Sequence, residues 1–161
     1  MRRKEREITS IDEKLAIIEK CKVCRLGLSA NNSPYIVPVN FGFTYESNRL
    51  TLFFHGAGEG RKMDIIRENN NACFEMDCDG KLIENETAAN FSYAYKSIIG
   101  FGKISILETD AEKTEALNIL MKHQTGSNKK YSYTADELSG VCVYKLSVDD
   151  FTGKKNPAGD W

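Results

Sequence analysis

The chain has 161 residues, of which 41% are hydrophobic and 28% charged, and this size and balance suit one globular domain with a buried core. Its formal net charge of −1 gives no electrostatic reason to expect nucleic acid or an anionic membrane as a partner. No apolar run approaches the ~20 residues of a membrane-spanning helix, and no apolar stretch follows the charged N-terminus as in a secretory signal. We therefore expect one domain over residues 1–161, located in the cytoplasm, without a nucleic-acid or membrane partner.

The N-terminal half of the chain has the pattern of a helix followed by strands. Ser10-Ile11-Asp12-Glu13 fits a capping box, and apolar residues at helical spacing behind it predict a helix over 11–21. Residues 35–45 alternate and predict a long strand, in which Pro38 should mark an edge, a bulge or an opening because proline has no N–H to donate. The other elements expected here are a strand over 23–29, a turn over 31–34, a hairpin turn over 46–48 and a strand over 49–55.

The C-terminal half alternates between helices and strands at irregular intervals. Thr109-x-x-Glu112 is a second capping box and predicts a helix that runs to about His123. The other elements expected are a helix over 59–69, a strand over 72–76, a loop over 77–92, a strand over 95–107 bent at Gly100 or Gly102, a polar linker over 126–134, a strand over 140–148 and a polar tail over 152–161 that ends in Trp161. Hairpins dominate this order, which favours an antiparallel barrel or sandwich with peripheral helices over a doubly wound sheet.

Five cysteines, an odd number, indicate free thiols in a reducing compartment. Cys21 and Cys24 form a C-x-x-C pair that follows a predicted helix and leads into a strand. We expect them to pack as small apolar side chains, and a redox or metal site is the alternative. The two histidines, His55 and His123, fit no metal-ligand pattern, so no metal is expected. His123 at a helix end should be structural, with its charge complementing the helix dipole.

The most informative stretch is F-F-H-G-A-G-E-G-R-K, residues 53–62. A strand that runs through a glycine-rich turn into a helix presents backbone N–H groups that bind anions, especially phosphate. Arg61 and Lys62 stand in the first turn of this helix, where the dipole favours acidic residues, and that conflict is relieved if an anion lies there. The alternative is a solvated turn with surface cations. The stretch is not a P-loop, because Met63 follows Lys62.

Two other segments suit a planar ligand that carries a phosphate. Residues 37–40 contain a proline that interrupts pairing and leaves backbone groups free. Residues 95–102 offer a hydroxyl, an aromatic ring and close-approach glycines. Together with the phosphate-binding turn, they favour a flavin or another phosphorylated heteroaromatic compound.

Several motifs, in order along the chain, carry a resemblance to a known family. They are M-R-R-K-x-R-E-I, P-Y-I-V-P-V-N-F-G, F-F-H-G-A-G-E-G-R-K, N-x-x-x-C-F-E and Y-x-S-I-I-G-F-G-K. From Met1 to about Leu120 the chain resembles the pyridoxamine 5′-phosphate oxidase-like superfamily, and within it the 5-nitroimidazole-resistance (Nim-type) proteins. The arginine-rich substrate contacts near the C-terminus of the oxidase have no counterpart here, where the tail is T-G-K-K-N-P. Oxidation of pyridoxamine phosphate is therefore not expected.

The resemblance implies a mainly β protein, an antiparallel split β-barrel that binds FMN, or occasionally FAD, between the two protomers of a homodimer. It implies that Gly60, Arg61 and Lys62 hold the flavin phosphate, and that His55 lies close to the flavin as the candidate catalytic side chain. The further cofactor-binding residues that it implies are Pro38, Val39 and Asn40 beside the ring, Gly56 and Ala57 in the turn, and Tyr95 and Ser97 from the side or from the partner subunit.

The resemblance also implies an activity. We expect a flavin-dependent reductase of small electron-poor compounds such as nitroaromatics, with NADH or NADPH as a transient donor in the same cleft. One alternative is a flavin-binding module for storage, sensing or sequestration that lacks robust turnover. A third interpretation is a haem-binding split barrel with His55 as the iron ligand.

Overall fold

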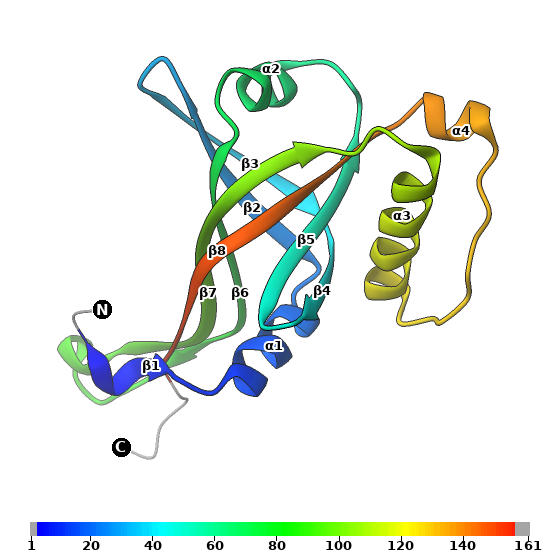
Figure 1. Cartoon of the computed structure of the whole chain (residues 1–161). Coiled ribbons are helices and arrows are strands. Elements are labelled where there is room, and N and C mark those ends of the chain that lie inside the picture. Colours follow the sequence, from blue (N-terminus) through cyan, green and yellow to red (C-terminus); the bar gives the residue numbers. More distant parts are fainter. Residues whose placement is uncertain (1–2, 157–161) are drawn as a thin grey trace.

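The computed structural model describes residues 3–156, which form one antiparallel sheet curled into a split β-barrel with helices around it (Figure 1). The strand order is β3-β2-β6-β7-β8-β5-β4, with the short β1 paired to β8. The strands are β1 (Glu7–Ile8), β2 (Val23–Ala30), β3 (Ser33–Asn40), β4 (Gly42–Glu46), β5 (Arg49–Gly56), β6 (Asn71–Ile83), β7 (Ser92–Ile106) and β8 (Cys142–Asn156). The helices are α1 (Ile11–Lys20), α2 (Arg61–Glu68), α3 (Asp110–Thr125), α4 (Ala135–Ser139) and the 3₁₀ turns η1 (Lys4–Arg6) and η2 (Ala88–Asn90).

Local sequence sets the two tightest hairpins. Asn31 and Asn32 join β2 to β3, and Ser47 and Asn48 join β4 to β5, all four with positive φ between 50 and 61°. Two successive left-handed residues match the twist of the flanking strands, and asparagine tolerates that conformation better than most residues. Both turns lie where the sequence predicts them.

The barrel interior is filled by alternate residues of the strands. Leu26, Phe54, Phe74 and Tyr144 have no exposed surface, and the ring of Phe54 stacks on that of Tyr144 with 5.3 Å between centroids. Figure 1 places α1 at one end of the barrel and α2 at the other. The interior is therefore bounded by a helix at each end.

Helices α3 and α4 lie beside the barrel, next to β4 and β5 (Figure 1). A second apolar cluster fills this junction and includes Leu117 of α3, Leu138 of α4 and Val143 of β8. The close approach of α3 to β4 depends on Gly42, because a Cβ at this position would lie 2.5 Å from the Cα of Leu120. Helix α3 thus covers the outer face of the sheet at β4 and β5.

Three strand boundaries differ from the sequence prediction. The predicted strand over 35–45 is two strands, β3 and β4, separated at Phe41. The predicted loop over 77–92 is wrong for residues 77–83 and for Ser92, because β6 continues to Ile83 and β7 begins at Ser92, whereas the strands are joined by a loop over 84–91 as predicted. The predicted polar tail over 152–161 is wrong for residues 152–156, because β8 runs to Asn156. Trp161 and the start of the N-terminal motif, Met1 and Arg2, lie outside the described residues.

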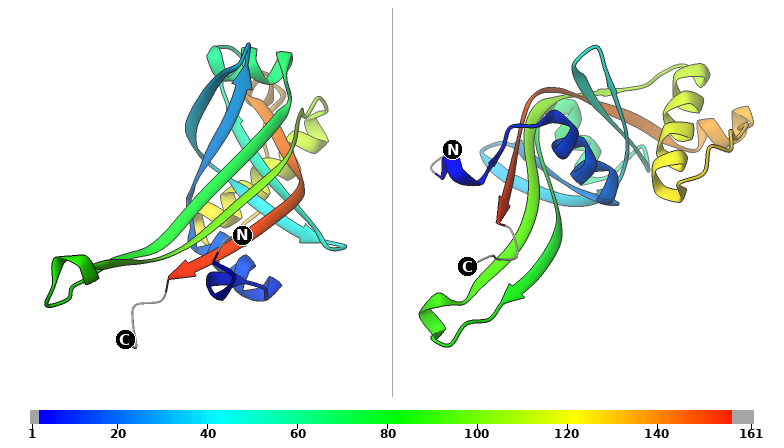
Figure 2. Two further views of the ribbon diagram at one scale, coloured as in Figure 1. Left: turned by 90° about the vertical axis from the view of Figure 1, so that its left-hand side faces the viewer. Right: turned by 90° about the horizontal axis from the view of Figure 1, so that it is seen from below.

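The missed part of β6 and β7 has a physical explanation. The two strands extend beyond the barrel as a hairpin arm, visible in Figure 2 as the green pair that projects from the body. Most residues from 79 to 93 are exposed, so no side of the arm requires a regular alternation of apolar residues. The expected irregularity near Gly102 is confirmed, because the register between β7 and β8 shifts between Phe101 and Gly102. Pro38 is confirmed on an edge strand, since β3 ends the strand order.

The helix caps were largely predictable. Thr109 and Glu112 form the reciprocal capping box that their spacing predicts. Ser10 caps α1 by accepting from the N–H of Glu13, but the Glu13 carboxylate accepts from Lys155 Nζ at 2.8 Å instead of reaching back. No helix within residues 3–156 is long and apolar enough to cross a membrane.

Candidate functional site

The start of α2 is the centre of the candidate site. Gly60 precedes the helix with φ 98°, a left-handed region that favours glycine, and no side chain caps the helix here. The carbonyl of Gly60 accepts from the N–H of Met63 at 2.8 Å and from that of Asp64 at 3.1 Å. The N–H groups of Arg61 and Lys62 stand at the uncapped start, where the helix dipole is positive. This end of α2 therefore has the backbone arrangement of an anion-binding site.

Lys62 leans from this helix start toward the barrel interior. Its Nζ lies 5.1 Å from the centroid of the Tyr144 ring and so close to Gly56 that a Cβ on Gly56 would be 3.0 Å away. Burial lowers the pKa of Lys62. Within residues 3–156 no carboxylate forms an ion pair with Lys62 or with Arg61. Lys62 is thus a half-buried ammonium group held by an aromatic face.

Arg61 leans in a different direction. It is exposed, and its guanidinium carbon lies 4.9 Å from the ring centroid of Tyr35 on β3. The turn before the helix is fixed by Arg67, which donates to the carbonyl of Gly58 at 2.6 Å. The two predicted phosphate ligands therefore flank the helix start, one toward β3 and one toward the barrel interior.

His55 lies close to this turn in the chain but on the other face of β5. It pairs with Val143, whose side chain belongs to the cluster under α3 and α4, whereas Gly56 pairs with Cys142 on the inner side. Successive side chains of a strand point to opposite faces. The structure therefore brings Gly56, Gly60 and Lys62 together, and it places the exposed His55 beside them facing outward.

The predicted ring-binding strand is the sheet edge β3. Pro38 and Asn40 are exposed on the outer face, and the side chain of Val39 packs against the core. Asn40 is anchored, because its Nδ2 donates to the carbonyl of Lys22 at 3.0 Å. The free edge of β3 leaves backbone groups available, as expected for contacts to a planar ligand.

Tyr95 and Ser97 lie far from the start of α2 within one chain. Ser97 pairs with Lys154 of β8, whereas His55 pairs with Val143 of the same strand. At ~3.3 Å per residue, this separation along β8 is on the order of 30 Å. The structure therefore does not bring these two predicted residues together with the turn.

The outer face that carries Tyr95 and Ser97 has exposed apolar side chains beside the ion pairs of Arg25 with Glu75 and Asp77. Cross-strand register places Ile36, Gly27, Cys73 and Phe101 in one row over four strands, and Ile99 in the next row. Ile36 is 70% exposed, Phe101 57% and Ile99 43%. A groove lined by Ile36 and Phe101, among others, crosses this face. The segment over 95–102 was predicted from the sequence to face a ligand, but Ile36 was not, although its outward alternation in a predicted strand was a usable signal.

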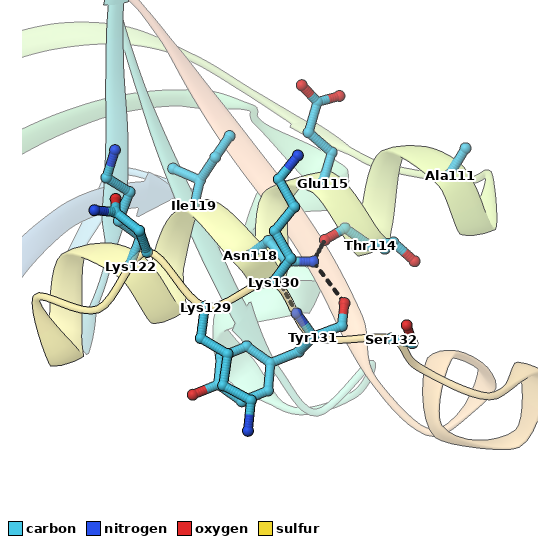
Figure 3. A pocket seen from close by; sticks show the side chains of 11 residues that line it. Ala111, Thr114, Glu115, Asn118, Ile119, Lys122, Lys129, Lys130, Tyr131 and Ser132 are labelled. Carbon is cyan, nitrogen blue, oxygen red and sulfur yellow. Dashed lines mark hydrogen bonds between the residues drawn. The ribbon is translucent and has the colours of Figure 1, made fainter.

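A larger groove of about 770 Å³ lies between α3 and the segment over 128–132 (Figure 3). Asn118 holds this segment to the helix: its Oδ1 accepts from the N–H of Tyr131 at 2.7 Å, and its Nδ2 donates to the carbonyl of Tyr131 at 2.9 Å. No predicted cofactor residue lines this groove, so it does not belong to the candidate flavin site.

His123 and the C-x-x-C pair are part of the packing. His123 is 4% exposed, its Nε2 lies 2.8 Å from the carbonyl oxygen of Cys21, and its ring packs against Phe41 and Phe43. Burial lowers the pKa of His123. Its structural role is confirmed, but the expected reason, a charge that complements the helix dipole, is wrong because burial favours the neutral ring. Cys21 and Cys24 are both buried, as predicted for packing side chains.

Residues 10–155 match the family model described as pyridoxamine 5′-phosphate oxidase. The chain belongs to this family. No curated protein matches the chain. Among solved structures, a candidate 5-nitroimidazole antibiotic resistance protein from Bacteroides thetaiotaomicron is 32% identical with a TM-score of 0.79, over 92% of this chain and 86% of that one.

Two solved structures with lower sequence identity to this chain share its fold. An FAD and heme binding protein from Mycobacterium smegmatis is 17% identical, with a TM-score of 0.81 over 94% of this chain and 73% of its own. A flavocytochrome from Azotobacter vinelandii is 19% identical, with a TM-score of 0.79 over 98% and 72%. At these identities the likeness shows the split β-barrel alone, a fold that flavin-binding proteins use.

The buried His123 makes stability depend on pH. Its pKa is about 6.5 in an unfolded chain and lower in the folded one, so the unfolded state binds the proton first as pH falls. The stabilising contribution is complete above about pH 6.5 and is lost as pH falls toward the folded pKa. We expect His123→Gln to be less stable at neutral pH, with a flatter decline between about pH 7 and 5.

Urea unfolding across this pH range measures the effect. The matched control is the exposed His55→Gln, which should keep the stability and pH dependence of the original chain. An equally steep decline in His123→Gln would show that His123 is not the titrating group.

Proposed function

We propose that this protein binds a flavin, FMN in the first place and FAD as the alternative, with the phosphate at the start of α2. The observation that carries the proposal is the start of α2, which follows Gly60, has no side-chain cap and is flanked by Arg61 and Lys62. Neither cation has a carboxylate partner among the described residues. Two cations at the positive end of a helix are unfavourable unless an anion lies between them. The family and its flavin-binding neighbours support the same ligand.

The side chains present fit a phosphate. Burying an unpaired ammonium group is unfavourable, and the lowered pKa of Lys62, caused by burial, reflects that cost. A phosphate dianion would offset the cost and would accept from the free N–H groups of the helix start. Arg61 supplies a second, exposed donor on the side of β3, where Pro38 and Asn40 would face the ring. Gly56 and Ala57 leave room for a close approach of the backbone.

We propose further that the flavin lies between two copies of the chain. The apolar outer face with Ile36, Ile99 and Phe101 would be covered by a second copy, which keeps these side chains from water. Such a homodimer would bring Tyr95 and Ser97 of one copy to the helix start of the other. It thereby accounts for the large separation of these residues within one chain.

The activity that we propose is reduction of small electron-poor compounds such as nitroaromatics, in the cytoplasm. A bound flavin supplies hydride and electron transfer, and NADH or NADPH is the proposed donor that enters the same cleft. The likeness to the candidate 5-nitroimidazole resistance protein supports this substrate class. The exposed imidazole of His55 stands beside the turn and would donate the proton that the substrate takes up on reduction.

Removing the Lys62 charge tests the phosphate contact. We expect Lys62→Met to weaken FMN binding about 10- to 100-fold, because a charge-assisted phosphate contact contributes roughly 1.5–3 kcal/mol. Riboflavin, which lacks the phosphate, should bind the original chain and the variant equally. Titration by flavin fluorescence measures both affinities.

The matched control is Lys129→Met, an exposed lysine beside Tyr131 that should leave FMN binding unchanged. If Lys62→Met loses as much affinity for riboflavin as for FMN, Lys62 does not act through the phosphate, and the proposed contact is wrong.

A charge on the apolar face tests the dimer. We expect the original chain to be a dimer at micromolar concentration and Phe101→Glu to be a monomer with weakened FMN binding, since Phe101 is 57% exposed in one chain and would be buried between two. Light scattering gives the mass. Phe91→Glu, at a 45% exposed position on the hairpin arm, is the control and should remain a dimer. A monomeric original chain, or a dimeric Phe101→Glu, contradicts the proposed interface.

Stopped-flow absorbance separates a reductase from a binding module. We expect the flavin-loaded protein to be reduced by NADH or NADPH within seconds and reoxidised by a nitroimidazole. His55→Gln should slow the reoxidation on the order of 100-fold while flavin affinity stays within a few-fold. Flavin binding without reduction on this timescale would favour the module for storage, sensing or sequestration. A Soret band in the purified protein would instead point to haem.

A further inference from the structure

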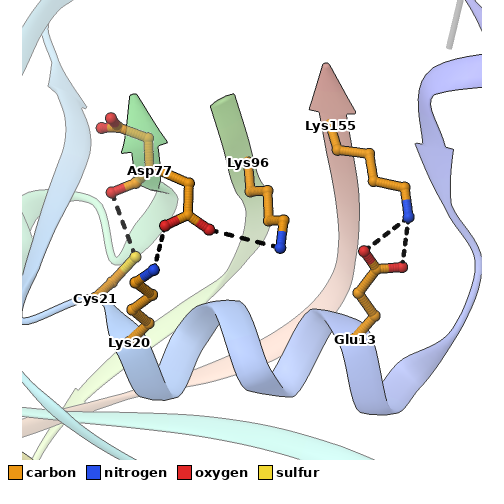
Figure 4. Close-up of polar contacts among 7 residues, drawn as sticks. Glu13, Lys20, Cys21, Asp77, Lys96 and Lys155 are labelled. Atoms are coloured by element: carbon orange, nitrogen blue, oxygen red, sulfur yellow. Dashed lines mark hydrogen bonds and ion pairs between the residues drawn. The ribbon is translucent and has the colours of Figure 1, made fainter. Parts of the chain in front are cut away.

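Two cysteines that are distant in the sequence meet at the end of α1. Cys21 follows the last residue of the helix, and its Sγ donates to the carbonyl of Asp77 on β6 at 3.4 Å (Figure 4). That carbonyl belongs to the peptide bond that joins Asp77 to Cys78. Cys78 therefore follows directly on the carbonyl that the Cys21 thiol contacts, and the side chains of both cysteines pack in the main apolar cluster.

Neighbouring ion pairs hold the two segments against each other. Lys20 of α1 pairs with Asp79 of β6, and Lys96 of β7 pairs with the same carboxylate at 3.5 Å (Figure 4). At the other end of the helix, Lys155 of β8 pairs with Glu13 at 2.8 Å. The end of α1 is thus fixed to the strands by contacts other than those of the thiols.

The C-x-x-C partner, Cys24, is placed differently. It has no exposed surface and lies on the inner face of β2, in line with Leu26 and Leu28. The thiol of Cys21 instead faces β6, where it contacts the carbonyl of Asp77 beside Cys78. Spatial proximity therefore selects Cys78, and not the neighbour in the sequence, as the partner of Cys21.

We propose that Cys21 and Cys78 are a modification site at which a hydroperoxide forms an intramolecular disulfide. The Cys78 thiolate attacks a peroxide oxygen, the O–O bond breaks, and the other oxygen leaves as water or alcohol after protonation, which gives a sulfenic acid. The sulfur of Cys21 then attacks that of Cys78, the S–O bond breaks, and water leaves with the thiol proton. The two thiols lose two electrons, and the peroxide gains them.

The surroundings assign the two roles. Cys78 is half-buried, and although burial and Asp79 raise the pKa of its thiol, Lys20 and Lys96 act to lower it. Burial raises the pKa of Cys21 to about 12, with Cys78 the next cause. Cys78 is the more exposed of the two side chains, so it is the thiol that meets the oxidant, and the buried Cys21 resolves the sulfenic acid. Because both pKa values are raised, the reaction should become faster as pH rises above neutrality.

The disulfide would close a loop from residue 21 to residue 78, which contains β2 to β5 and α2. A cross-link over a loop of this length restricts the unfolded chain more than the folded one. Oxidised protein should thus have a higher Tm than reduced protein, and dithiothreitol should reverse the increase.

Peptide mapping of peroxide-treated protein tests the proposal. The protein is treated with hydrogen peroxide, blocked with an alkylating reagent and cut with trypsin without reduction. Peptide 68–81 contains both Cys73 and Cys78, so the map is made on Cys73→Ser. We expect peptide 68–81 of this variant to be linked to peptide 21–22, with a loss of two hydrogens. The extent should be independent of protein concentration, and Tm should rise.

Variants at the other positions complete the test. Cys24→Ser is the matched control and should keep both the cross-link and the rise in Tm, whereas Cys78→Ser and Cys21→Ser should lose both. A link from Cys21 to Cys24, a link between chains, or oxidation of Cys78 to sulfinic acid with Cys21 still free would each overturn the proposal.

Discussion

The pairing of β7 with β8 is the constraint on which the arrangement of the molecule depends. The ladder runs from Tyr95 to Ile106, and the two strands belong both to the barrel and to its lower extension. One end of β8 pairs with β5 beside the start of α2, and the other end carries β1 and faces α1. Because these strands are continuous, the two sets of predicted flavin residues are held at fixed places that lie far apart within one chain.

In the homodimer that we propose, this geometry would connect ligand binding to assembly. The start of α2 supplies charge and backbone N–H groups, whereas the outer face supplies apolar side chains, and the two lie on different parts of the surface. An apolar face with Ile36 70% exposed and a half-buried lysine without a carboxylate are both unfavourable in an isolated chain. In the homodimer that we propose, the same association relieves both, so flavin binding and dimerisation should be thermodynamically coupled.

Sequence was sufficient where structure is determined by near neighbours. The two hairpin turns and the capping box at Thr109 follow from residues a few positions apart, and all lie where they are predicted. The same rule would have found α4, since Thr134 and Glu137 form another box with the same spacing. The hairpin arm was missed because most of its residues are exposed and show no regular alternation, and the end of β8 was missed because it pairs with β7, more than 50 residues earlier in the chain.

The candidate site also has a part that depends on neighbouring residues in the sequence and a part that depends on long-range pairing. The helix-dipole conflict at Arg61 and Lys62 is local, so the prediction of an anion site there needs only the sequence. That Lys62 leans over Tyr144, and that His55 faces the opposite side of β5, follow from cross-strand register, which no local pattern contains.

Cys21 shows most directly how sequence spacing and spatial proximity diverge. A C-x-x-C pair brings two thiols together when both stand on the first turn of a helix, where positions three apart share a face. Here the helix ends at Lys20, and the chain turns into β2 between the two cysteines. Side chains alternate between the two faces of a strand, and that of Cys24 points into the barrel. The side chain of Cys21 lies at the helix end against β6. The position of the helix terminus, more than the spacing of the cysteines, therefore decides which thiol Cys21 meets.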